Sequence, residues 1–139
     1  MQNEEIIKSA NLEFYRAIES GVIERMEDVW WHTENARCVH PGWNLLVGWS
    51  RIRAAWEQIF AGEEKMRISP ADVYVYQSED FAWVTCTENI TVFQETSFDT
   101  LQAVATNLFI QRNGKWLMLH HHASPIPAME LDTQSDIIQ

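Results

Sequence analysis

The stretch Cys38-Val39-His40-Pro41-Gly42-Trp43 decides how the rest of this chain is interpreted. A short apolar segment ends at His40, and Pro41-Gly42 then stops it, because proline lacks a backbone donor and glycine admits a tight turn. Trp43 and Trp49 follow within nine residues of the histidine. A titratable side chain at a strand end, beside a turn and aromatic side chains, is typical of a small binding pocket. We therefore predict that His40 faces a pocket.

Helical periodicity of apolar residues lies on both sides of this stretch and predicts helices over 3–20, 23–31 and 50–60. Asn3 can cap the first helix, and Gly21 ends it. A short strand is predicted over 36–40. The segment Leu45-Leu46-Val47 is expected to pair back with it as the arm of a hairpin.

After the third helix the helical periodicity disappears, and strands are predicted over 66–77, 81–95, 100–111 and 116–124. Asn113-Gly114 is a strong hairpin signal between the last two strands. Helices followed by a long antiparallel meander predict an α+β fold, with the helices packed on one face of a curved sheet. One domain is expected over residues 1–127, followed by a loose C-terminal tail over 128–139.

Composition restricts the classes of partner. The chain has 139 residues and a formal net charge of −10, and its 10 Lys and Arg are scattered. Without a basic stripe we predict no nucleic-acid partner, and an anionic membrane surface would repel the chain. Cys38 and Cys86 are expected to be reduced, buried thiols. The N-terminus resembles no signal peptide and no apolar run has membrane-spanning length, so a cytoplasmic location is predicted.

Strand alternation sorts the side chains of the last strand into two sets. The smaller, more apolar set is expected to face the helices: Leu117, Leu119, His121 and Ala123. The other set is wide, aromatic and partly polar, and we predict that it forms an interface: Trp116, Met118, His120 and His122. Because a monomer should not leave such a patch in water, a homodimer through the sheet is predicted.

The strand over 81–95 sorts in the same way but leaves its facing open. One side carries Phe81, Trp83, Thr85, Thr87 and Asn89, and the other carries Ala82, Val84, Cys86, Glu88 and Ile90. Glu88 could form a polar cluster in the cavity with Thr87 and Asn89, but we interpret it as an outward carboxylate at the interface or the rim of the pocket.

Several of these segments together resemble the NTF2-like superfamily, specifically its SnoaL-like and ketosteroid-isomerase-like members. The resemblance covers about residues 3 to 126 and rests on the first helix ending at Gly21, the segment Ala36 to Gly42, the helix around Trp56, and the ending Asn113 to Pro125. That ending also resembles the association domain of calmodulin-dependent kinase II. The resemblance implies three helices against a strongly curved sheet, a pocket inside this cone, and a dimer.

The resemblance also assigns candidate catalytic positions. The isomerases place their general base just before the proline that ends the first strand, and His40 occupies that place. Phe14 matches the position of their oxyanion-binding tyrosine, with Tyr15 out of phase by one, and Thr106 matches their protonated aspartate. Since both oxyanion donors are missing or weakened, steroid isomerisation is not predicted.

From these observations we predict a pocket for a small organic molecule, with His40 as general base and His121 and Thr106 as ligand-orienting groups. The walls would be Phe14, Trp30, Trp56 and Trp83. The structural alternatives are that His40 ties the turn by a hydrogen bond, that His121 is a core residue, and that the tryptophans only pack the core. Only His120 and His122 of the histidine run share a face, and two ligands do not make a zinc site, so no metal and no cofactor are predicted.

Two functions remain open at this point. One is an enzyme of the isomerase, cyclase or hydratase type, acting near a carbonyl or ring. The other is a non-enzymatic module that binds a ligand or drives oligomerisation.

Overall fold

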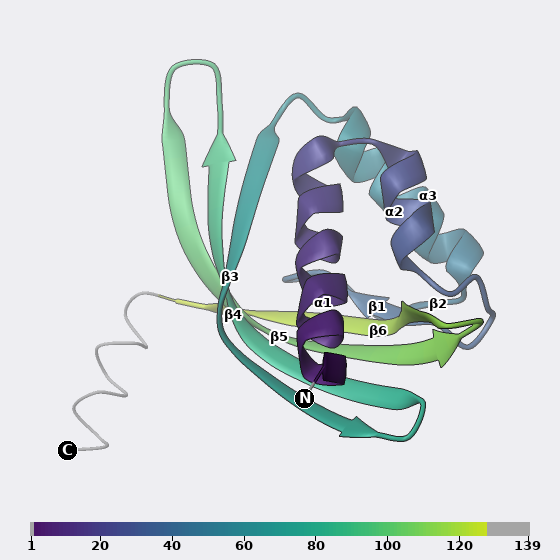
Figure 1. The fold of residues 1–139 in the computed structure, drawn as a ribbon. Helices are drawn as coiled ribbons and strands as arrows, with labels where there is room; N and C mark the ends of the chain where they lie inside the picture. Colours follow the sequence, from purple (N-terminus) through teal and green to yellow (C-terminus); the bar gives the residue numbers. More distant parts are fainter. Residues whose placement is uncertain (1, 128–139) are drawn as a thin grey trace.

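The computed structural model describes residues 2–127 and contains three helices and one six-stranded sheet (Figure 1). The predicted tail over 128–139 lies outside the described residues. The elements are α1 (Gln2–Ser20), α2 (Ile23–Val29), β1 (Arg37–Val39), β2 (Leu46–Val47), α3 (Trp49–Ala61), β3 (Lys65–Ser78), β4 (Phe81–Phe93), β5 (Phe98–Arg112) and β6 (Lys115–Ile126).

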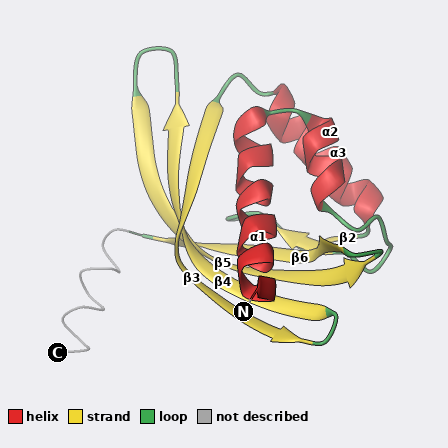
Figure 2. Cartoon of the chain, in the orientation of Figure 1, coloured by secondary structure: helices red, strands yellow, loops and turns green. Residues whose placement is uncertain are grey.

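The sheet has the strand order β2-β1-β6-β5-β4-β3. All neighbouring pairs are antiparallel except β1 and β6, which run parallel with Arg37 opposite His120, Cys38 opposite His121 and Val39 opposite His122. The sheet curves strongly around α1, and α2 and α3 lie beside that helix (Figure 2). The predicted α+β fold is confirmed, and so is the hairpin between β1 and β2.

The core lies between the helices and the inner face of the curved sheet. Helix α1 contributes the fully buried Ile7 and Phe14, and α3 contributes Ile52 and Trp56. Gly21 has a positive φ of 65° and follows the last residue of α1, as its position after the periodic stretch predicted. None of the helices within residues 2–127 is long and apolar enough to cross a membrane.

The last strand contains a bulge, and the side chains of its first half face the opposite way from the prediction. Leu108 of β5 pairs with His120, but the next residue, Phe109, pairs with Met118, so Leu119 is an extra residue in β6. An extra residue shifts the alternation of side chains by one position, so the residues before and after Leu119 do not follow one continuous pattern. The prediction that Trp116 and Met118 lie on the outer face is therefore wrong, since both are buried in the core.

Beyond the bulge, the prediction holds. His121 and Ala123 are buried on the inner face, whereas His122 is exposed. A second irregularity lies in β3 between Ala71 and Tyr74, where Asp72 has a φ of 50°. Bulges bend the strands that carry them and increase their twist, which accounts in part for the curvature that makes room for a cavity.

Candidate functional site

A cavity of about 230 Å³ lies between the helices and the inner face of the sheet. Its lining comes from α1, the end of β1, α3 and four strands, and consists of Ile18, His40, Pro41, Trp43, Trp56, Ile59, Met66, Ile68, Glu88, Ile90, Val92, Leu101 and His121. Most of these side chains are apolar. The polar ones are one carboxyl group and two imidazoles.

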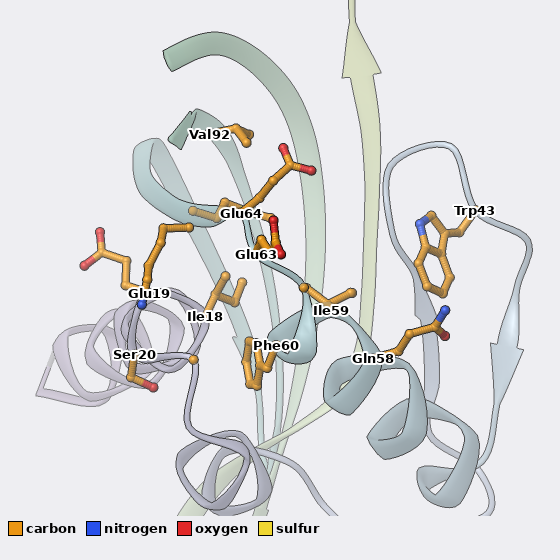
Figure 3. Close-up of a pocket in the computed structure, with 14 residues that line it drawn as sticks. Ile18, Glu19, Ser20, Trp43, Gln58, Ile59, Phe60, Glu63, Glu64 and Val92 are labelled. Carbon is orange, nitrogen blue, oxygen red and sulfur yellow. The ribbon is translucent and has the colours of Figure 1, made fainter. Parts of the chain in front are cut away.

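A wider hollow of about 480 Å³ adjoins this cavity and is drawn in Figure 3. We call it the vestibule: it lies between the end of α1, the end of α3 and the start of β3. Its lining shares Ile18, Trp43, Ile59, Met66 and Val92 with the cavity. Because the two hollows share these walls, they lie side by side.

His40 lies where the sequence predicted, at the end of β1 with its ring in the cavity wall. The Trp43 amide donates to the His40 carbonyl oxygen at 2.9 Å, which closes the turn after the strand. The imidazole is only 4% exposed and packs edge-on against Trp43 and Trp56, with ring centroids 4.9 and 4.6 Å away. Burial lowers the pKa of His40 to about 4, so the ring is neutral at pH 7.

Glu88 is the largest correction to the predicted site. It was expected at the rim, but it is 2% exposed and lines the cavity. The Tyr15 hydroxyl donates to Glu88 Oε2 at 2.8 Å. Burial raises the pKa of Glu88 to about 7, although the hydrogen bond from Tyr15 opposes this shift. The signal was present in the sequence, because alternation placed this carboxylate on the apolar side of its strand.

A buried network of hydrogen bonds orients the groups beside Glu88. His121 Nδ1 lies 2.6 Å from Asn107 Oδ1, and Asn107 Nδ2 donates to Asn11 Oδ1 at 2.8 Å and to the Tyr15 hydroxyl at 3.0 Å. An amide oxygen only accepts, so the proton of the neutral His121 ring is on Nδ1. Its Nε2 is then an acceptor, 3.9 Å from Glu88 Oε2.

The surroundings keep His121 uncharged. Burial, followed by the nearby His40, lowers the pKa of His121 well below its usual range. The His40 and His121 ring centroids are 6.3 Å apart. The cavity thus holds two neutral imidazoles and one carboxyl group that titrates near pH 7.

The predicted aromatic walls are only partly in place. Trp56 lines the cavity, while Phe14 and Trp30 are buried behind it as a supporting layer. The Phe14 ring lies 5.8 Å from Trp56 and 4.7 Å from His121, measured between centroids. Trp83 was predicted as a wall, but it is 49% exposed on the outer face of the sheet.

At each of the two positions matched to oxyanion donors, the polar group near the site belongs to the next residue in the chain. Thr106 pairs with His122 and lies on the outer face, while the adjacent Asn107 is buried on the inner face. On α1, both Phe14 and Tyr15 are buried, because the curved sheet surrounds the helix on more than one side. The hydroxyl group near the site therefore belongs to Tyr15.

The histidine pair His120 and His122 lies on the other side of β6 from the cavity, with ring centroids 6.1 Å apart. Among residues 2–127, no three His, Cys, Asp or Glu side chains come close enough together to hold a metal ion.

Replacing Tyr15 with Phe is expected to raise the pKa of Glu88 above about 7, because the variant removes a donor that stabilises the carboxylate. The titration of a ¹³C-labelled Glu88 carboxyl group by NMR measures this shift directly. Tyr74→Phe is the control, since Tyr74 is 71% exposed on the outer face. An unchanged Glu88 midpoint in Tyr15→Phe would show that the hydroxyl has no influence on the carboxyl group.

Comparison with known proteins identifies the family. Residues 7–129 match the model of the SnoaL-like domain. The chain belongs to the SnoaL-like family. A proposed dehydratase of the NTF2-like family from Streptomyces avermitilis is 31% identical to this SnoaL-like chain, with a TM-score of 0.86, over 91% of this chain and 98% of that protein. The predicted membership of the NTF2-like superfamily is confirmed.

Two further relatives have different contexts. A proposed calcium/calmodulin-dependent protein kinase type II association domain from Thiobacillus denitrificans is 28% identical, with a TM-score of 0.72, over 86% of this SnoaL-like chain and 94% of that domain. The F-box protein SKIP8 of Arabidopsis thaliana is 28% identical over 132 residues. This match covers 95% of the SnoaL-like chain but 53% of the relative, so the chain spans about half the length of that curated protein.

Proposed function

We propose that this chain is an enzyme that transfers protons on a small organic molecule bound in the cavity, in a dehydration or isomerisation. The observation that carries the proposal is Glu88: a carboxyl group in an apolar cavity, with a pKa of about 7, beside a neutral imidazole. A group that titrates near working pH is suited to general acid–base catalysis. The similarity to a proposed dehydratase, at 31% identity over nearly the whole length of both proteins, supports this reaction class.

The proposed dehydration moves one proton from the substrate to an imidazole and one from Glu88 to the leaving hydroxyl. An imidazole takes a proton from a carbon next to a carbonyl or ring, and the electron pair of that C–H bond forms a C=C bond. The neighbouring C–O bond breaks, and the leaving hydroxyl takes the proton of Glu88 and departs as water. The imidazole then returns its proton to the carboxylate, directly or through water.

The roles of the other groups follow from their charge. We assign Glu88 as the proton donor. We do not assign catalysis to His40 alone as general base, because a pKa of about 4 makes it a weaker base than the sequence suggested. His40 and His121 Nε2 face the ligand as neutral acceptors, and Trp56 forms a flat wall. Tyr15 and Asn107 act through Glu88 and His121, and are positioning residues.

The test is a search for proton transfer by NMR. Six-membered-ring β-hydroxy ketones are incubated with the chain in D₂O, and loss of water and deuterium incorporation next to the carbonyl are followed. Wild-type protein should accelerate at least one of these reactions. His40→Ala should weaken binding or slow turnover while the protein stays folded by circular dichroism. A chain that accelerates neither reaction for any compound would count against the proposal.

A second candidate, self-association, is favoured by one observation. Tyr74, Tyr76 and Trp83 are 71%, 63% and 49% exposed and line a shallow groove on the outer face of β3 and β4. We propose that the predicted homodimer uses this aromatic patch, with His120 and His122 on the same face, in place of Trp116 and Met118. The similarity to a proposed association domain is consistent with it. The cytoplasmic location stays a prediction.

Trp83→Glu is expected to weaken such a dimer by about 2 kcal/mol or more, roughly thirty-fold in Kd, because it places a charge in an aromatic contact. Sedimentation equilibrium measures the change. Leu45→Glu is the matched control, since Leu45 is 54% exposed in the loop before β2. Identical association of the wild type and both variants would place the interface elsewhere.

A further inference from the structure

The charges in the cavity differ from those expected of a site for an anionic ligand. Among residues 2–127, those that line it include no Lys and no Arg. The only groups that could carry positive charge are His40 and His121, and burial holds both rings neutral near pH 7. A carboxylate ligand placed here would lose its water without gaining a cationic partner, which disfavours its binding.

The vestibule lies beside the cavity, and its charge adds a second barrier to any anion that passes through it. Its lining carries Glu19, Glu63 and Glu64, and Figure 3 shows all three around the hollow. Within the described part of the chain, Lys65 is the one basic residue in this lining. Glu19 is paired with Arg67 at 3.7 Å. The chain as a whole has a formal charge of −10. A negative surface around an opening lowers the local concentration of anions and their rate of entry.

Cations are not favoured inside either. An ammonium group would find one carboxyl group, Glu88, which is only partly ionised at pH 7 because burial raises its pKa to about 7. The rest of the wall consists of aliphatic side chains, Met66 and two tryptophans. The cavity therefore suits a ligand without formal charge, whose polar atoms meet Glu88, His40 and His121.

The volume of the cavity limits the size of the ligand. A dry protein cavity of about 150 Å³ holds benzene. At about 230 Å³ this cavity is about one and a half times as large. In proportion, it accommodates one substituted ring or two fused rings, and a third fused ring would have to extend into the vestibule.

We propose that the cavity takes uncharged compounds of one or two rings that carry a hydroxyl or carbonyl group on one edge, and that it rejects carboxylates and phosphates of the same shape. The proposal names the substrate class of the enzyme proposed above and rests on that site. Its test uses binding alone, so that selective binding without turnover would leave the ligand class standing and overturn only the catalysis.

The experiment compares matched probes by isothermal titration calorimetry at pH 7 with the full chain. The probes are 2-naphthylmethanol, 2-naphthoate and 2-naphthylmethylamine in its ammonium form, with 9-anthracenemethanol as the three-ring probe. 2-Naphthylmethanol is expected to bind at least tenfold more tightly than each of the other three. Tightest binding by naphthoate or by the ammonium, equal binding by the three-ring alcohol, or no binding by 2-naphthylmethanol would each overturn the proposal.

A charge-reversal variant separates the charge of the entrance from the shape of the cavity. Glu64 is exposed in the vestibule, so Glu64→Lys should fold like the wild type. It is expected to raise the association rate of 2-naphthoate severalfold at low salt and to leave that of 2-naphthylmethanol unchanged. Glu95→Lys, an exposed change in the β4–β5 loop, is the control for overall charge. Equal effects of the two variants would show that the vestibule makes no specific contribution.

Discussion

Replacing Glu88 with Gln is expected to lower turnover by about 10²- to 10⁴-fold, the usual contribution of a positioned general acid or base. Glutamine keeps the shape of the side chain and can still accept the hydrogen bond from Tyr15, but it cannot transfer a proton. The measurement is the initial rate on whichever compound the NMR search identifies. Undiminished turnover in Glu88→Gln would exclude this carboxyl group as the proton donor.

The same variant is expected to change how stability depends on pH. The folded-state pKa of Glu88 is raised from 4.5 to about 7. The fold is therefore more stable below pH 4.5, where Glu88 is protonated, than at high pH, and this stabilisation is lost as pH rises through 7. The shift corresponds to about 3 kcal/mol. Above pH 7, Glu88→Gln should therefore be more stable than the wild type by up to that amount.

His40 acts in the opposite direction and sets the conditions of the measurement. Its pKa is lowered from 6.5 to about 4, so its contribution is complete above pH 6.5 and is lost as pH falls through 4. Urea unfolding between pH 6.5 and 8.5 consequently measures Glu88 without a contribution from His40. Glu95→Gln, in the exposed loop between β4 and β5, is the control. A wild-type stability that rises with pH over this range would contradict the predicted ionisation of Glu88.

Replacing Phe14 with Ala is expected to lower the free energy of unfolding by about 3–5 kcal/mol, the range for a buried aromatic residue truncated to alanine. Phe14 has no exposed surface, and its ring lies against Tyr15 at 4.9 Å and against Trp30 at 6.4 Å, in addition to the cavity residues Trp56 and His121. Against a typical total of about 5–15 kcal/mol this loss is large.

Urea denaturation of matched variants tests this prediction. Phe14→Leu should lose less, because it leaves most of the side-chain volume in place. Phe98→Ala, on a side chain that is 63% exposed, should change stability by no more than about 0.5 kcal/mol. A loss below about 1 kcal/mol for Phe14→Ala would mean that the surrounding rings close the space, and that Phe14 does not support the cavity wall.

The architecture could be predicted from the sequence because its signals are local. The glycine after α1, the turn after His40 and the Asn113-Gly114 hairpin are each decided by a few neighbouring residues. Since these turns also mark where the helices and strands end, the α+β fold followed from them. The position of His40 in the cavity wall followed for the same reason, as it is the last side chain before a forced turn.

The site could be predicted only in part, because long-range packing decides which of two adjacent side chains faces the cavity. One bulged residue, Leu119, moved Trp116 and Met118 from the predicted outer face into the core. Asn107 and Tyr15 each stand one residue from the position matched by resemblance. Nothing local distinguishes adjacent residues of a strand or a wide helix face when both neighbours become partly buried.

The parallel pairing of β1 with β6 has a consequence for when the cavity is completed during folding. It joins residues 37–39 to residues 120–122, so His40 and His121 become neighbours only when the last strand is added. Contacts between such distant segments form slowly, because a long loop must close first. Under the proposed function, a nascent or truncated chain that ends before β6 would contain three helices and most of the sheet but would lack the pair of imidazoles, so it is expected not to bind the ligand.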